Sequence, residues 1–356
     1  MKAEIIKTCC DVDSTTLSLP GYSEHCITVQ SCDAMHALMK QATERLNAAV
    51  VSQFVFAGRE HYSESATVKP AVWLHGDACK SGNIYSTQAI AVSGAEPQPV
   101  MLSGKNIGVV YEDPFARYCR LHGVAPQNIS ASREEQVQSA FETMEAALNA
   151  AGFKFTDTVR TWIYLDRLLD WYTEFNTVRT NYFRNAGIFE HMVPASTGIG
   201  AANHLGAAIM MDVLAVQPKT PEMKIQEVIS PLQNPALDYK SSFSRAVEMQ
   251  YPTHRSLMIS GTASIDPDGK TVFQDDPEKQ IHLTLDVVRA ILRSREMDWR
   301  NLFRGIAYFK DMSYLPLYQK IAEKAGIPRF PLAISHADVC RHDLLFEIEV
   351  DAVKIQ

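Results

Sequence analysis

The chain has 356 residues, of which 46% are hydrophobic, and a formal net charge of −7. Such a length predicts two or three domains or repeated units with a large core. The acidic balance and the lack of any Lys/Arg run longer than two residues argue against nucleic-acid binding through phosphate contacts. No apolar run approaches the roughly 18–20 residues of a membrane span, so no membrane partner is expected.

The cysteines indicate the redox compartment. There are seven, an odd number, at positions 9, 10, 26, 32, 79, 119 and 340, and none form a C-x-x-C motif. The first seven residues lack the apolar core of a signal peptide. Reduced thiols and a cytoplasmic location are therefore expected.

The first third predicts one helix followed by three strands. Residues 1–30 are poorly patterned. Asp33 is a candidate cap for a helix over 34–50. Strands are expected at 51–57, 71–75 and 83–92, with a turn over 76–82.

The middle third begins after a boundary at residues 97–99. A strand is expected within 101–111, and 113–132 is expected to be loop or short helix. Ser132-Arg133-Glu134-Glu135 is a capping box that opens a helix to about residue 151. The remaining expected elements are a strand at 159–165, a helix at 168–186 and two strands after Pro194, the last at 207–216.

The last third follows a proline-rich segment, residues 218–235, which is expected to be a linker. Strands are expected at 257–265 and 302–309, with a short return at 271–273. Helices are expected at 277–295 and 315–325, the second ended by Gly326.

The C-terminal segment alternates apolar and acidic residues. Phe346, Ile348, Val350 and Ala352 alternate with three carboxylates, Glu347, Glu349 and Asp351. Period-two alternation places the carboxylates on one face of a strand. In water that face is simply solvated, but in a cleft at least one carboxyl has a raised pKa and carries a proton at neutral pH. Cys340 precedes Glu347 across a polar turn, and a hairpin there brings the two together.

The middle and last thirds repeat one plan of strands and helices. Arg160 and Tyr164 match Arg304 and Tyr308 at an offset of 144, and Ala215 matches Ala352 at 137. The expected units are residues 1–96 (degenerate), 97–217 and 236–356, joined by the linker at 218–235. Aligning the final strands sets Met210 opposite Glu347. Either one copy has a working site, or Met210 faces a buried surface and Glu347 an exposed one.

These features resemble the Rid/YjgF superfamily, also called endoribonuclease L-PSP-like. The resemblance rests on the repeated plan, on Phe175-Asn176-Thr177-Val178-Arg179, on Pro194-Ala195-Ser196-Thr197 and on the final strand. It implies an α+β fold of tandem chorismate-mutase-like β-α-β units, with sheets packed against helices in a pseudo-trimer. Imine-hydrolysing members carry an arginine after the Pro-Ala pair, where this chain has Ser196 and Ala333.

Within the superfamily, the chain is similar to the chorismatase branch. The hallmark is Ser260-Gly261-Thr262-Ala263-Ser264-Ile265, preceded by a segment around Arg245. This resemblance implies a cofactor-free lyase or hydrolase that releases pyruvate from chorismate or a related enol-pyruvyl carboxylate, with Glu347 as general acid. Cys340, seven residues earlier, is typical of the subtype that forms 3-hydroxybenzoate. The alternatives are a deaminase or hydrolase of another carboxylated imine or enamine, and a non-catalytic small-molecule binder.

A dianionic substrate requires cations, and arginine grips carboxylates bidentately. The candidates for substrate binding are Arg160, Arg179, Arg245, Arg304, Tyr164, Ala263 and Glu349. Alternatively each arginine pairs with a local carboxylate: Asp157 or Asp166 for Arg160, and Glu174 for Arg179. Glu349 either raises the pKa of Glu347 or pairs with an arginine, and Cys340 is either a thiolate nucleophile or part of the pocket wall.

Two further expectations concern metals and assembly. His336, Asp338, Cys340 and His342 alternate along an extended segment, where successive same-face residues lie roughly 6.5–7 Å apart, too far for all four to reach one ion. No metal is therefore predicted. The chain is expected to be a monomer with internal pseudo-symmetry or a homo-oligomer, with a trimer as one option.

Overall fold

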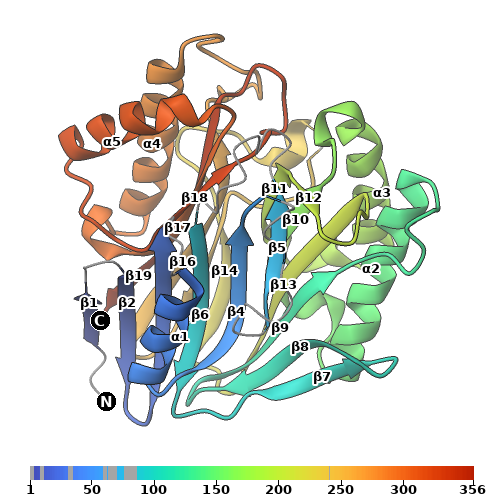
Figure 1. The fold of residues 1–356 in the computed structure, drawn as a ribbon, viewed down its shortest axis with the longest axis vertical. Helices are drawn as coiled ribbons and strands as arrows, with labels where there is room; N and C mark the ends of the chain where they lie inside the picture. The colour runs from blue at the N-terminus through green and yellow to red at the C-terminus, as the bar shows by residue number, and fades with distance from the viewer. Residues whose placement is uncertain are drawn as a thin grey trace.

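The computed structural model describes residues 4–8, 12–30, 35–58, 62, 70–75, 86–239 and 241–356. These residues form three sheets, one of seven strands and two of six. The α-helices lie on the outside, with α4 and α5 at the upper left of Figure 1 and α2 and α3 at the right. This arrangement is the α+β fold expected from the sequence, with sheets packed against helices.

The first sheet has the strand order β1-β2-β3-β6-β4-β5-β12. Its members are β1 (Glu4–Thr8), β2 (Val12–Leu19), β3 (Tyr22–Gln30), β4 (Ala49–Phe56), β5 (Val72–His75), β6 (Ser86–Ser93) and β12 (Ala202–Asn203), with helix α1 (Met35–Arg45). The short strand β12 is donated by the middle of the chain and pairs with β5.

The second sheet has the order β11-β10-β13-β9-β8-β7. Its strands are β7 (Gln98–Leu102), β8 (Lys105–Glu112), β9 (Ala116–Val124), β10 (Thr158–Leu165), β11 (Ala195–Gly200) and β13 (Ile209–Pro218), with helices α2 (Arg133–Ala150) and α3 (Tyr172–Asn185). The predicted capping box is confirmed: the Ser132 hydroxyl accepts from the Glu135 amide, and the Glu135 carboxylate accepts from the Ser132 amide.

The third sheet has the order β14-β15-β16-β19-β17-β18. Its strands are β14 (Lys224–Val228), β15 (Ala246–Gln250), β16 (His254–Ala263), β17 (Leu302–Phe309), β18 (Leu332–His336) and β19 (Phe346–Ile355), with helices α4 (Pro277–Ser294) and α5 (Leu315–Lys324). Asp276 caps α4 by accepting from the Lys279 amide, and Pro277 occupies the first turn, where no backbone donor is needed.

Strand registers confirm the repeat. Arg160 faces Leu214 just as Arg304 faces Asp351, and Tyr164 faces Met210 just as Tyr308 faces Glu347. The first sheet has the same irregularity. Its strand register shifts just before Ser52, as the registers of the other two sheets shift just before Arg160 and Arg304. The chain therefore contains repeated Rid-like units, and the alignment of Met210 with Glu347 is correct.

The core is divided in a way that explains the alternation in β19. Phe346, Ile348 and Val350 pack with α4 and α5 in a core belonging to the third sheet. Other apolar residues from all three sheets, including Phe54, Trp162 and Tyr308, form one central core. The helix-facing side of each sheet is thus apolar, while the inner sides meet one another, which places the β19 carboxylates between sheets rather than in water.

Several predicted elements were wrong. Residues 12–30, thought to be poorly patterned, form β2 and β3, and β9 occupies much of 113–132, thought to be loop or helix. The predicted linker contains β14, which pairs with β15. We therefore propose that the last unit begins near residue 218. The Asp33 cap and the turn at 76–82 lie outside the described residues. Among the described helices, none has the length and apolar character needed to cross a membrane.

Candidate active site

A cleft between the second and third sheets contains the main sequence candidates. We call it the Glu347 cleft. The second sheet and α3 contribute Tyr172, Arg179, Ser196 and Gly198, and the third sheet and its loops contribute Tyr239, Ser241, Phe243, Arg245, Gly261, Ala263, Ile265, Cys340, Arg341 and Glu347. Backbone bonds join the two sides, with the Gly200 amide donating to the Asp338 carbonyl at 2.8 Å and the Ser244 amide to the Pro194 carbonyl at 3.1 Å.

A bulge in β16 makes room for the Glu347 side chain. The register between β16 and β19 shifts between Ile259 and Thr262, which frees Gly261 from regular pairing. The Gly261 amide donates instead to the Thr197 hydroxyl across the cleft at 3.0 Å. A Cβ at position 261 would collide with Oε1 of Glu347. The Ser-Gly-Thr-Ala-Ser-Ile motif therefore shapes the wall against which this carboxyl lies.

Glu347 is the carboxyl with the altered protonation behaviour. Its side chain is buried, with 5% relative exposure for the residue. Burial is the main cause that raises its pKa to about 8, and the negative charge of Glu349 adds to the effect. Arg160 and Arg245 offset only part of this rise. The carboxyl is therefore mostly protonated at neutral pH and able to act as an acid.

Glu349, two residues along the same strand face, has the opposite character. It accepts from Arg160 at 3.0 Å, from Arg304 at 2.6 Å and from the indole of Trp162 at 2.8 Å. Burial alone would raise its pKa, but the charges of Arg160 and Arg304, together with hydrogen bonds from Thr197 and Trp162, outweigh burial and hold the pKa below its ordinary value. A charged Glu349 beside a protonated Glu347 divides the two carboxyls into distinct roles.

Two guanidiniums in the cleft wall have no carboxylate partner within the part of the chain that the structure describes. Arg179 is 2% exposed and donates to the Asn176 amide oxygen at 2.6 Å, and its Nε has no partner among the described residues. Arg245 donates to the Asn234 carbonyl at 2.9 and 3.1 Å. Burial lowers the pKa of both groups. Buried cations without counter-ions in a cleft suit an anionic ligand.

Cys340 shares the cleft with Glu347. Burial, with the neighbouring Glu347 as a second cause, raises the pKa of its thiol to about 12. At neutral pH the group is a thiol rather than a thiolate, which favours the pocket-wall interpretation over the nucleophile.

Not all predicted residues reach the cleft. Arg179, Arg245, Ala263, Cys340 and Glu347 line it. Arg160, Arg304, Tyr164 and Glu349 are instead part of the buried interior behind it, and Arg304 also bonds Asp351 at 2.9 Å.

The local ion pairs considered for the arginines are also wrong. Arg160 pairs with Glu349 of the third sheet rather than with Asp157 or Asp166. Arg179 bonds Asn176 rather than Glu174.

The parallel strand pairs correct one detail of the repeat alignment. Ser196 pairs with Thr161, and Leu332 pairs with Gly305, the counterpart of Thr161. Leu332, not Ala333, is therefore equivalent to Ser196. Either way, the arginine of imine-hydrolysing members has no counterpart.

Sequence reasoning missed Tyr172, Tyr239 and Arg341. Arg341 donates to the Thr271 hydroxyl at 3.3 Å, and its guanidinium lies 6.0 Å from the ring centre of Tyr239. Arg341 belongs to the polar turn beside Cys340, so the turn itself was an available signal. Tyr172 and Tyr239 come from a helix start and a short helical turn with no distinguishing pattern.

The possible zinc ligands have separate partners. His336 hydrogen-bonds the Lys310 carbonyl at 3.0 Å, while Asp338 lies 3.8 Å from the Lys310 ammonium. Across the described ranges, no group of three or more His, Cys, Asp or Glu side chains is arranged to hold a metal ion.

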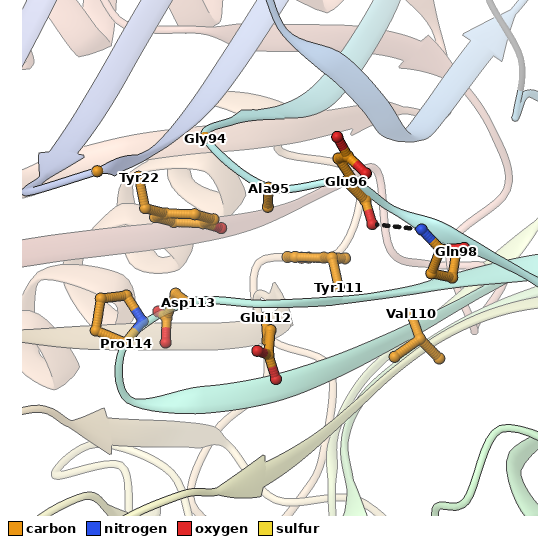
Figure 2. Close-up of a pocket in the computed structure, with 11 residues that line it drawn as sticks. Tyr22, Gly94, Ala95, Glu96, Gln98, Val110, Tyr111, Glu112, Asp113 and Pro114 are labelled. Carbon is orange, nitrogen blue, oxygen red and sulfur yellow. Dashed lines mark hydrogen bonds between the residues drawn. The ribbon is translucent and has the colours of Figure 1, made fainter.

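A second pocket lies away from these groups, between the β2–β3 turn and β8. Figure 2 shows the rings of Tyr22 and Tyr111 on opposite sides of Ala95, with Glu112 and Asp113 below. The Asp113 carboxylate already accepts hydrogen bonds from the Phe115 and Ala116 amides at 2.7 Å, so it holds the local backbone turn. The described lining contains carboxylates but no Lys or Arg, so this pocket does not suit a carboxylated substrate.

Comparisons with known proteins agree with the fold. The family model for endoribonuclease L-PSP matches residues 122–217 and 234–354, which is more than half of the chain. A chorismatase crystal structure superposes with a TM-score of 0.63 and 19% identity, covering 85% of this chain and 93% of that one.

Two curated proteins are similar in sequence. A chorismatase from Streptomyces rapamycinicus is 26% identical over 216 residues, or 55% of this chain and 64% of its own length. A 3-hydroxybenzoate synthase from Streptomyces hygroscopicus is 24% identical over 242 residues, or 60% of this chain and 68% of its own length. The match thus spans less than two thirds of the first relative's length and slightly more than two thirds of the second's. On the family match, the chain belongs to the endoribonuclease L-PSP (Rid/YjgF) family.

Proposed function

We propose that the chain is a chorismatase-like enzyme that removes pyruvate from chorismate or a related enol-pyruvyl carboxylate and yields a hydroxybenzoate-type acid. The observation that carries this proposal is a buried carboxyl, Glu347, with its pKa raised to about 8, in a cleft that also holds two arginines with no carboxylate partner among the described residues. A proton donor beside two buried arginines that bond only neutral groups in the described part of the chain matches a substrate that is both anionic and acid-labile. The similarity to a chorismatase and a 3-hydroxybenzoate synthase supports the same choice.

Glu347 would act as general acid on the enol ether. Its proton is transferred to the terminal vinyl carbon, and the former double-bond electrons form the new C–H bond. The ether carbon becomes an oxocarbenium ion, and Glu347 becomes a carboxylate. Water adds to that carbon and gives a proton back to the Glu347 carboxylate, and the resulting hemiketal collapses to pyruvate and a ring alcohol. Loss of water from the dihydroaromatic ring then gives the hydroxybenzoate.

Arg179 and Arg245 would bind the two substrate carboxylates. They come from opposite sides of the cleft, α3 and the segment before β15, so a substrate held by both spans the space in front of Glu347. Each charge-assisted pair replaces neutral hydrogen bonds to Asn176 and Asn234. In this assignment Cys340, as a neutral thiol, forms part of the pocket wall.

Substrate entry requires the cleft to widen. Its open volume is about 40 Å³, well below the roughly 300–1,000 Å³ of typical ligand pockets. Tyr239 comes from a short helical turn and Arg341 from a loop, so neither belongs to a sheet. Their displacement makes room for a ring without disturbing Glu347 on β19.

The direct test is to incubate the purified chain with chorismate and measure pyruvate by coupling to lactate dehydrogenase. Pyruvate release by the native chain, and little by Glu347→Gln, is the expected result. If the native chain releases no more pyruvate than the Glu347→Gln variant, the proposed reaction is wrong.

A further inference from the structure

The three sheets generate related clefts, of which the Glu347 cleft is one. Register places Met210 and Ser86 at the positions equivalent to Glu347, because they face Tyr164 and Phe56 as Glu347 faces Tyr308. Neither side chain is a carboxylic acid. The other two clefts therefore lack the proton donor of the first.

The cleft between the third and first sheets is closed at this position. The Ser86 hydroxyl donates to the Ile334 carbonyl at 2.8 Å and accepts from the Ile334 amide at 2.9 Å. The Gln30 side chain also donates to the Leu332 carbonyl at 3.1 Å. The backbone of β18 at Leu332 and Ile334, which would face a ligand in this cleft, is thus already hydrogen-bonded to side chains of the first sheet.

The cleft between the first and second sheets remains open. We call it the His122 cleft. It encloses about 760 Å³ and is lined by residues that include Trp73, Lys105, His122 and His204. Register makes Trp73 the counterpart of Gly198, and His122 the counterpart of Ser260 in the β16 bulge. The same construction that forms the Glu347 cleft is therefore reused here with different side chains.

His122 brings a buried polar group to this wall. Its Nδ1 lies 3.3 Å from Oδ2 of Asp212, whose Oδ1 accepts from the Gly123 amide at 2.8 Å. In the neutral ring, an Nδ1 proton directed at Asp212 leaves Nε2 as an acceptor. Nε2 is buried and has no hydrogen-bond partner in the described part of the chain. A buried acceptor left unpaired is costly, so a ligand hydroxyl that reaches it is favoured.

The other side chains indicate the ligand's charge and shape. The rings of Tyr62 and His204 stack at 4.8 Å across the two units, and Tyr62 meets Trp73 edge-on at 5.6 Å. Lys105 is an exposed cation in the lining, and the described lining residues include no Asp or Glu. An aromatic wall with a cation suits a planar anion.

We propose that the His122 cleft is a second, non-catalytic binding site for a small aromatic hydroxy acid. The ring lies against Tyr62 and Trp73, the carboxylate meets Lys105, and the hydroxyl donates to Nε2 of His122. Met210 is the counterpart of Glu347 and supplies no carboxyl, so the acid of the Glu347 cleft has no equivalent in this site. The proposal stands on these residues and does not require the reaction assigned to the Glu347 cleft.

The test uses the full chain carrying Arg245→Leu, which weakens the Glu347 cleft. Binding of 3-hydroxybenzoate, benzoate and benzylamine is measured by isothermal titration calorimetry. We expect 3-hydroxybenzoate to bind several-fold more tightly than benzoate, and benzylamine not to bind. Adding Lys105→Ala should weaken 3-hydroxybenzoate binding about tenfold, whereas Lys224→Ala, at an exposed lysine of β14, should not.

Adding His122→Leu should abolish the preference for 3-hydroxybenzoate over benzoate. If that variant fails to fold by circular dichroism, Tyr62→Ala, at a 39% exposed residue, takes its place and should weaken both acids. Absence of 3-hydroxybenzoate binding to the Arg245→Leu chain overturns the proposal. So does binding of 3-hydroxybenzoate that is indifferent to Lys105→Ala and to whichever of His122→Leu and Tyr62→Ala is measured, or tighter binding of benzylamine.

Discussion

The carboxyl of Glu347 rests directly on the backbone of Gly261, at the one place where β16 bulges away from β19. Any side chain at position 261 would occupy the space that Oε1 of Glu347 now fills. The bulge and the glycine together allow a full glutamate side chain to fold into a closed interface, where its proton is retained.

Replacing Gly261 therefore tests the carboxyl's position. Gly261→Ala should reduce pyruvate release at least a hundredfold, because the new methyl group forces the Glu347 carboxyl out of its place. Gly198→Ala is a matched control in the same cleft, since a Cβ there has no neighbour within 4 Å. Turnover by both variants is compared after circular dichroism confirms folding. Equal activity in the two would contradict the assigned position.

Removing the acid itself should have a larger effect on turnover than on binding. Glu347→Gln keeps the shape of the side chain but cannot donate the proton, so kcat should fall by about 10²–10⁴-fold. Glu227→Gln is the control, because partial desolvation raises the pKa of Glu227 too, but this residue lies exposed on β14 outside the cleft. A Glu347→Gln variant with near-native kcat would remove Glu347 from the mechanism.

The pH profile should report the same group. Glu347 must be protonated to act, and its pKa is raised to about 8, so kcat/KM should be level below that pH and fall above it. Stability should follow the same direction. The folded chain holds a proton that the unfolded chain releases near its ordinary value, so this contribution is lost as pH rises through about 8. Thermal melts from pH 6 to 9 should show a steeper decline for the native chain than for Glu347→Gln.

The buried charges behind the cleft should matter for stability. Arg304→Met leaves Glu349 with one guanidinium fewer and Asp351 without its 2.9 Å partner. Loss of one member of a buried ion pair costs about 3–5 kcal/mol, measurable by urea denaturation. Arg300→Met, at an exposed pair with Asp298, should shift the urea midpoint far less. Similar losses for both would show that the buried network contributes little.

Replacing or labelling Cys340 distinguishes its two possible roles, as part of the pocket wall or as a thiolate nucleophile. Because its thiol pKa is raised to about 12, Cys340→Ala should lower kcat less than tenfold, and iodoacetamide at pH 7 should label the native residue slowly. Rapid labelling, or a loss of activity as large as that of Glu347→Gln, would restore the nucleophile role.

Some parts of the fold follow from local pattern. The capping box at Ser132 marked the start of α2, and period-two alternation marked β19, because both depend on neighbouring residues alone. By contrast, β9 and β14 were missed since their sequences lack clear alternation, and their strand character comes from pairing with β13 and β15. The partners of Arg160 could not be predicted for the same reason, as Glu349 is 189 residues away.

By itself the sequence determined the repeated plan, the acid at position 347 and the substitution of Met210 at its counterpart. Only the tertiary structure decided that Glu347 is buried between two units, that Arg179 and Arg245 share its cleft, and that Arg160 and Arg304 neutralise Glu349 instead. The reason is physical: alternation assigns a side chain to a face of a strand, but the environment of that face depends on which distant sheet packs against it. The pKa of a carboxyl, and with it the chemistry, is set by that environment.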